Sequence, residues 1–130
     1  MKIKMYCIFA KESVVKMNGV RGKLATQAGH AYLNAYWDSM SDMAADGDRP
    51  KFSNAMAYQM ANHCYKITLV VDTVEELKTL QNAYRDKVGT ALITDAGFTV
   101  FTEPTTTCLG IGPIPENMIG DDLKALKTFC

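Results

Sequence analysis

The chain has 130 residues, of which 48% are hydrophobic, and its 14 lysines and arginines balance 14 aspartates and glutamates. This length suits one domain with a substantial core, and the zero net charge provides no overall attraction to nucleic acid or to a membrane surface. No apolar run approaches a membrane-spanning length, and the start MKIKMYCIFA lacks the features of a secretory signal peptide. The four cysteines form no CxxC pair, so we expect reduced thiols and a cytoplasmic location.

The first half of the chain predicts a strand and a long helix joined by a basic loop. Residues 3–9 are apolar and β-prone, residues 10–21 are basic and contain a glycine, and residues 22–40 have helical periodicity. On that helix, one face carries Leu24, Ala28, Ala31 and Ala35, and another carries Lys23, Gln27, His30 and Asn34. We expect the first face to pack on the core and the second to be a polar surface.

The start of this helix is unusual. Arg21, Gly22 and Lys23 replace the usual side-chain cap and acidic first turn, and the helix dipole disfavours positive charge there. Lysines also precede it, so a basic patch is predicted on one side of the molecule. We therefore expect a negative charge from outside the helix to meet its first turn.

The second half alternates strands with helices. The predicted elements are a polar loop over 41–50, a weaker helix over 51–63, a strand over 65–72, a helix from Thr73 to about Lys87, a strand over 90–94, a turn over 95–97, a strand over 106–112 and a last helix within 116–127. Thr73 and Glu76 form a capping box, and Pro115 suits the start of a helix. The pattern predicts an α/β fold in one domain, residues 1–130: a three-layer sandwich with a small mixed sheet flanked by helices. One core is expected to contain Leu24, Ala28, Leu69, Val71, Leu92 and Ile111.

Two familiar phosphate-binding patterns are incomplete. In NGVRGKL, two residues rather than four separate Gly19 from Gly22, and a leucine follows Lys23, so the Walker A loop is excluded. The segment 109–112, LGIG, lacks the third glycine of a dinucleotide fingerprint and is interpreted as a strand end leading to a turn. His63 and Cys64 have no further ligands at metal-site spacing, so no metal site is predicted.

Lys23 and Asp95 each lie at the end of a predicted element and near a glycine, since Gly22 precedes Lys23 and Gly97 follows Asp95 by two residues. In α/β folds, ligands bind in the crevice beyond the carboxyl ends of the strands. If the strands over 3–9 and 90–94 are parallel, both side chains can face that crevice. The alternative is two unrelated surface charges.

Three motifs, in order, resemble those of the peptidyl-tRNA hydrolase 2 family. They are Lys16-Met17 followed by GKLATQAGHA over 22–31, TALITDAGFT over 90–99, and TCLGIGP over 107–113. The resemblance covers nearly the whole chain except about residues 38–63.

The resemblance implies hydrolysis of the ester that joins a peptide to tRNA, without a metal or organic cofactor, with the tRNA acceptor end as partner. It implies Lys23, Asp95 and Thr99 as catalytic residues. The implied substrate-binding residues are Arg21, Gly22, Gln27, His30, Phe98 and Thr107. In this interpretation, tRNA phosphates meet the basic helix start, Lys23 stabilises an oxyanion, and Asp95 orients or deprotonates water or holds Lys23. Thr99 and Gln27 position water or the ester.

Two departures from the family pattern leave alternatives open. Phe98 replaces the arginine that follows DAG, and Val100 replaces a glutamine; Phe98 can instead stack on a terminal base. The second hypothesis is a tRNA-binding module with weak or no chemistry. The third is a protein-interaction domain that uses residues 38–63. No membrane partner is expected, and a homodimer is left open.

Overall fold

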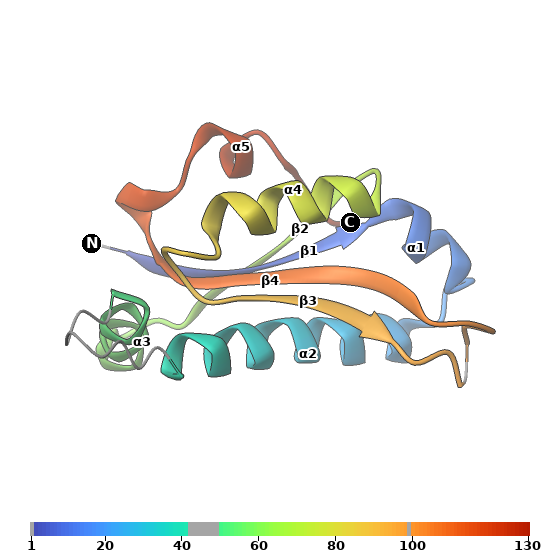
Figure 1. Cartoon of the computed structure of the whole chain (residues 1–130), viewed down its shortest axis with the longest axis horizontal. Coiled ribbons are helices and arrows are strands. Elements are labelled where there is room, and N and C mark those ends of the chain that lie inside the picture. Colours follow the sequence, from blue (N-terminus) through green and yellow to red (C-terminus); the bar gives the residue numbers. More distant parts are fainter. Residues whose placement is uncertain (1, 42–49, 99) are drawn as a thin grey trace.

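The computed structural model describes residues 2–41, 50–98 and 100–130. Its elements are β1 (Ile3–Ala10), α1 (Lys11–Lys16), α2 (Arg21–Met40), α3 (Pro50–Met60), β2 (Tyr65–Val71), α4 (Val74–Tyr84), β3 (Thr90–Asp95), β4 (Thr105–Pro115), η1 (Glu116–Met118), α5 (Asp121–Lys124) and β5 (Lys127–Thr128) (Figure 1). None of the described helices is both long and apolar enough to cross a membrane.

The five strands form one mixed sheet in the order β3-β4-β1-β2-β5. β1 pairs with β2 in parallel, and β4 runs antiparallel to both of its neighbours, β1 and β3. β1 and β3 therefore point the same way, so Ala10 and Asp95 end at the same edge of the sheet. This is the arrangement that the shared-crevice prediction requires.

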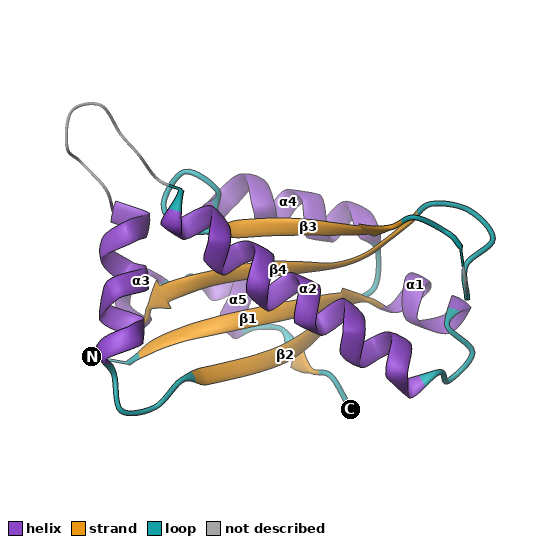
Figure 2. Cartoon of the chain, turned by 90° about the horizontal axis from the view of Figure 1, so that it is seen from below, coloured by secondary structure: helices purple, strands orange, loops and turns teal. Residues whose placement is uncertain are grey.

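Helices cover both faces of the sheet, which confirms the predicted three layers. α2 and α3 lie on one face, and α4 and α5 lie on the other (Figures 1 and 2). The prediction of a single core is wrong, because the sheet divides the six chosen residues between its faces. Leu69, Val71, Leu92 and Ile111 belong to the cluster under α4, whereas Leu24 and Ala28 pack in the cluster under α2.

α2 lies unusually close to the sheet because Gly110 of β4 has no side chain. A Cβ atom at Gly110 would stand 2.0 Å from the carbonyl oxygen of Ala31. Ala31 and Ala35 are fully buried at this contact. The segment LGIG is thus the middle of β4, and its interpretation as a strand end is wrong.

The sequence predicts a loop over 10–21, but residues Lys11–Lys16 form the short helix α1. This helix has no side-chain cap, and long-range bonds hold it. Ser13 Oγ donates to the Thr106 carbonyl at 2.6 Å, and the Glu12 carboxylate accepts from the Val74 backbone N–H at 2.9 Å. Six residues without a cap carry too little local signal to predict a helix.

α4 begins as predicted. Thr73 is its N-cap, and its hydroxyl accepts from the Glu76 backbone N–H at 3.3 Å. The returning bond differs from the standard capping box, since the Glu76 carboxylate accepts from the Asp72 N–H instead. The helix ends at Tyr84, three residues before the predicted end.

The predicted last helix is wrong in length. Residues 116–128 form a 3-10 turn, the four-residue helix α5 and the two-residue strand β5. Gly120 separates the two helical pieces, and Lys127 and Thr128 pair with Val70 and Leu69 of β2. The edge of β2 thus pairs with Lys127, which the local pattern assigned to a helix, and with Thr128, which follows the predicted helix.

Candidate active site

Lys23 and Asp95 are in direct contact, although 72 positions separate them. Lys23 comes from the first turn of α2, and Asp95 is the last residue of β3. Lys23 Nζ lies 2.5 Å from Asp95 Oδ2, and the two side chains expose 14% and 11% of their surface. The predicted proximity of this pair is confirmed, and the alternative of two unrelated charges is wrong.

Asp95 is also held by a chain of hydrogen bonds that comes from the protein interior. Gln27 Nε2 donates to Asp95 Oδ2 at 3.2 Å, and the Thr107 hydroxyl donates to Gln27 Oε1 at 2.6 Å. Gln27 and Thr107 are 1% and 0% exposed. The predicted polar face of α2 is therefore wrong for Gln27, whose side chain faces the sheet beside Ala31 rather than solvent. A polar group is tolerated there because both ends of its amide are paired.

The carboxylate is held in its charged form. The bond from Lys23 lowers the pKa of Asp95 below its usual value of 3.8, and the Gly97 N–H, at 2.8 Å from Oδ1, acts in the same direction against partial burial. Asp95 is ionised at neutral pH. Its charge lies beside the first turn of α2, which has no side-chain cap and no acidic residue. Asp95 thus supplies part of the negative charge that the helix start lacks.

Gly97 makes the turn after Asp95 possible. Its φ of +87° lies in the left-handed region, and a Cβ there would stand 2.4 Å from the backbone of Glu103. A glycine at this position lets the chain fold back closely enough for the Gly97 N–H to reach Asp95.

Sequence reasoning missed Phe101 as a residue of the site. Its ring is 4% exposed, and Lys23 Nζ lies 5.8 Å from the ring centroid. Phe101 also borders a pocket of about 210 Å³ with Lys16, Val100 and Thr105, next to the Lys23–Asp95 pair. A hydrophobic residue in a threonine-rich loop has no local pattern that would mark it.

The other predicted residues lie around this pair or beyond it. Arg21 and Gly22 are exposed at the start of α2, and Phe98 exposes 90% of its surface beside the Gly97 turn. His30 is also exposed, but it lies seven residues along α2 from Lys23, about 10 Å at the helical rise. Thr99 lies outside the described residues.

The protein is thus an α/β sandwich with a lysine–aspartate pair at the edge of the sheet where β1 and β3 end. The model of the family "Peptidyl-tRNA hydrolase PTH2" matches residues 3–129. The chain belongs to this family of hydrolases.

Named relatives agree with the family model. The chain is 31% identical over 109 residues to "Peptidyl-tRNA hydrolase" of Thermococcus onnurineus, covering 82% of this chain and 84% of that protein. It is 33% identical over 110 residues to the protein of the same name from Methanococcus vannielii, covering 84% and 87%. It is 34% identical over 110 residues to "Probable peptidyl-tRNA hydrolase 2" of Schizosaccharomyces pombe, covering 84% of this chain and 49% of that protein.

Proposed function

We propose that this chain hydrolyses the ester between peptide and tRNA in peptidyl-tRNA, and that Lys23 and Asp95 carry out the chemistry. Membership of the family supports the reaction. The 2.5 Å contact between two charged side chains at the carboxyl edge of the sheet supports the assignment of these residues.

In this proposal, Lys23 stabilises the transition state. Water attacks the carbonyl carbon of the ester and loses a proton, and negative charge develops on the carbonyl oxygen. The bond to the ribose oxygen then breaks, and the departing ribose oxygen takes up a proton to become a hydroxyl. The ammonium of Lys23 is held by Asp95 in a partly water-excluded position, so little reorganisation is needed when the charge appears. Removing one such donor typically costs about 10²–10³ in rate.

Asp95 acts in this proposal mainly by orienting Lys23. A carboxylate that accepts from Lys23, Gln27 and the Gly97 N–H, and whose pKa is lowered, is a poor proton acceptor at neutral pH. Thr99 is retained as a proposed positioning group for water, on the family resemblance alone.

Substrate binding is assigned to the residues around this pair. Arg21 and Gly22 present positive charge and backbone N–H groups at the start of α2, which suits a tRNA phosphate. Phe98 offers a solvent-exposed ring to an unpaired base at the acceptor end. Gln27 and Thr107 support Asp95 from the interior and do not reach the substrate, since both are buried. His30 remains a proposed contact further along α2.

The test is single-turnover cleavage of peptidyl-tRNA, together with tRNA binding at two salt concentrations. Lys23→Ala should lower the cleavage rate by about 10²–10³ and flatten the salt dependence of binding. Asp95→Asn should lower cleavage while tRNA binding persists. Near-normal cleavage by a folded Asp95→Asn variant would remove Asp95 from the mechanism. Binding without any cleavage by the wild type would favour the tRNA-binding module.

The proposal also covers domain organisation, cellular location and oligomeric state. Residues 1–130 act as one domain. The protein works in the cytoplasm, which the four free thiols support, since a reducing compartment keeps cysteines unpaired. Two copies pair along the outer edge of β3, which bonds only to β4 within the described sheet. Sedimentation of the purified chain at several concentrations tests this association.

A further inference from the structure

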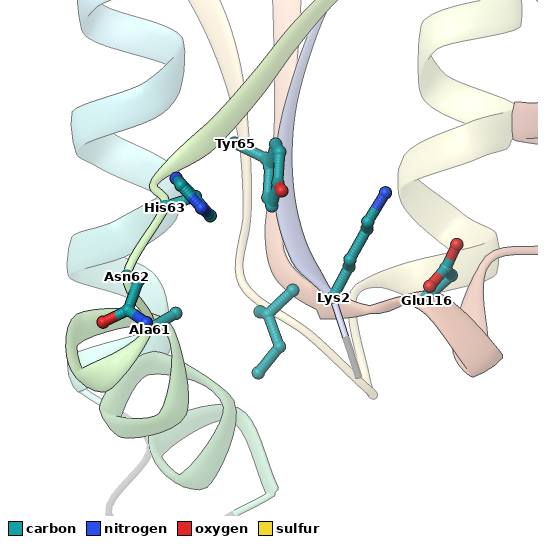
Figure 3. A pocket seen from close by; sticks show the side chains of 7 residues that line it. Lys2, Ala61, Asn62, His63, Tyr65 and Glu116 are labelled. Atoms are coloured by element: carbon teal, nitrogen blue, oxygen red, sulfur yellow. The ribbon is translucent and has the colours of Figure 1, made fainter.

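A second cavity lies at the opposite edge of the sheet from Lys23 and Asp95. Its volume is about 460 Å³, within the size range of small-molecule sites. It opens between the segment that joins α3 to β2 and the start of β1 (Figure 3). β1 has eight residues, so the cavity lies about 25 Å from the proposed active site.

The walls of this cavity are aromatic. The rings of His63 and Tyr65 lie 5.6 Å apart between centroids, tilted by 50°. Tyr65 is the first residue of β2, and 36% of its surface is exposed. Ile3 and Ala61 add apolar groups to the lining. A flat ring can therefore insert against apolar groups on more than one side.

The rim carries one cation, one amide and one carboxylate. Lys2 Nζ lies 5.5 Å from the Tyr65 ring centroid, and no ion pair to Lys2 occurs in the described part of the chain. Asn62 and Glu116 complete the rim (Figure 3). Lys4 pairs with Tyr65 in the β1–β2 register and adds a second positive charge on the same side of the sheet.

We infer that this cavity binds a nucleoside phosphate. A base would contact His63, Tyr65 and the apolar lining residues, while the Asn62 amide offers both a donor and an acceptor to the base edge. Glu116 would accept from ribose hydroxyls, and Lys2 would meet the phosphate. Inorganic phosphate alone would leave the aromatic walls unused. An acidic peptide would likewise leave the aromatic walls unused, and an apolar peptide would leave Lys2 and Asn62 without partners.

The ligand chemistry has two sources, an unpaired nucleotide of RNA or a free mononucleotide. The inference does not depend on the proposed function, because binding here is measured without ester cleavage. Failure of one therefore leaves the other standing.

The test is titration of the ¹⁵N-labelled chain with adenosine monophosphate, followed by NMR. We expect amide shifts at residues 61–65 and 116. Tyr65→Ala should weaken binding at these residues by about 5- to 150-fold, the usual range for loss of one stacking partner. Trp37→Ala removes an exposed aromatic side chain of α2 that does not line the cavity, so it is the matched control and should leave these shifts unchanged. Lys2→Met should weaken the monophosphate but not adenosine.

A short single-stranded oligoadenylate identifies the source. Tighter binding of the oligonucleotide than of the mononucleotide indicates RNA, and the reverse indicates the free mononucleotide. His63→Ala replaces Tyr65→Ala if thermal melting shows that the latter is unfolded. The inference is overturned if millimolar mononucleotide gives no shifts at residues 61–65, or if inorganic phosphate reproduces these shifts. It is also overturned if the folded aromatic variant and Lys2→Met both bind the mononucleotide as tightly as the wild type.

Discussion

Thr107→Val tests the buried support of Asp95 with almost no change in side-chain shape. The substitution removes the hydroxyl that donates to Gln27 Oε1 at 2.6 Å. Gln27 is 1% exposed, so its oxygen would lose its partner where water has little access. Leaving a buried acceptor unpaired costs about 1–3 kcal/mol. With an unfolding entropy of about 2.1 cal/mol/K per residue over 130 residues, each kcal/mol lowers Tm by about 4 °C. The expected loss is therefore about 4–11 °C.

Thr106→Val is the matched control. Its hydroxyl bonds to that of Thr94 at 3.0 Å in an exposed position, so water can replace the bond. The control should change the free energy of unfolding by no more than about 0.5 kcal/mol. Urea unfolding and thermal melting of both variants provide the comparison. Equal stability of Thr107→Val and Thr106→Val would refute the view that the Gln27–Thr107 bond supports the site.

Three further predictions concern packing, charge and recognition. Gly110→Ala should lower the free energy of unfolding, measured in urea, by about 1–3 kcal/mol, because its Cβ would stand 2.0 Å from a carbonyl oxygen of α2. The control Gly29→Ala meets no atom within 4 Å and should stabilise α2 by about 0.5–1 kcal/mol, so equal effects of the two variants would contradict the close packing. Because the pKa of Asp95 is lowered on folding, its pairing with Lys23 stabilises the protein above pH 3.8, and this stabilisation is lost as the pH falls below that value. The difference in unfolding free energy between wild type and Asp95→Asn should stay constant from pH 7 to about 5 and shrink below about 4. A difference that grows on acidification would contradict this. Phe98→Ala should weaken tRNA binding by about 5- to 150-fold, and a tRNA without its unpaired terminal nucleotides should bind both proteins equally; an undiminished affinity would remove the stacking role.

The sequence determined those features that depend on neighbouring residues. The apolar run of β1, the periodicity of α2 and the Thr73 cap of α4 each carry their own signal, since strand alternation, helical spacing and capping bonds act over a few residues. The three ordered motifs were sufficient to indicate the family. The sequence also placed Lys23 and Asp95 at the ends of elements that a parallel arrangement brings together.

Only the tertiary structure determined those features in which long-range contacts override the local preference of the chain for a loop, a helix or a polar surface. α1 forms because Ser13 and Glu12 bond to β4 and to the start of α4, and β5 forms because the edge of β2 accepts Lys127. Local spacing assigned Gln27 to a polar surface. Because Gly110 has no side chain, α2 packs closely on the sheet, and Gln27 is buried. Thr107, 80 residues away, then pairs the buried amide. Such distant bonds depend on which strands become neighbours, and no short stretch of sequence contains that information.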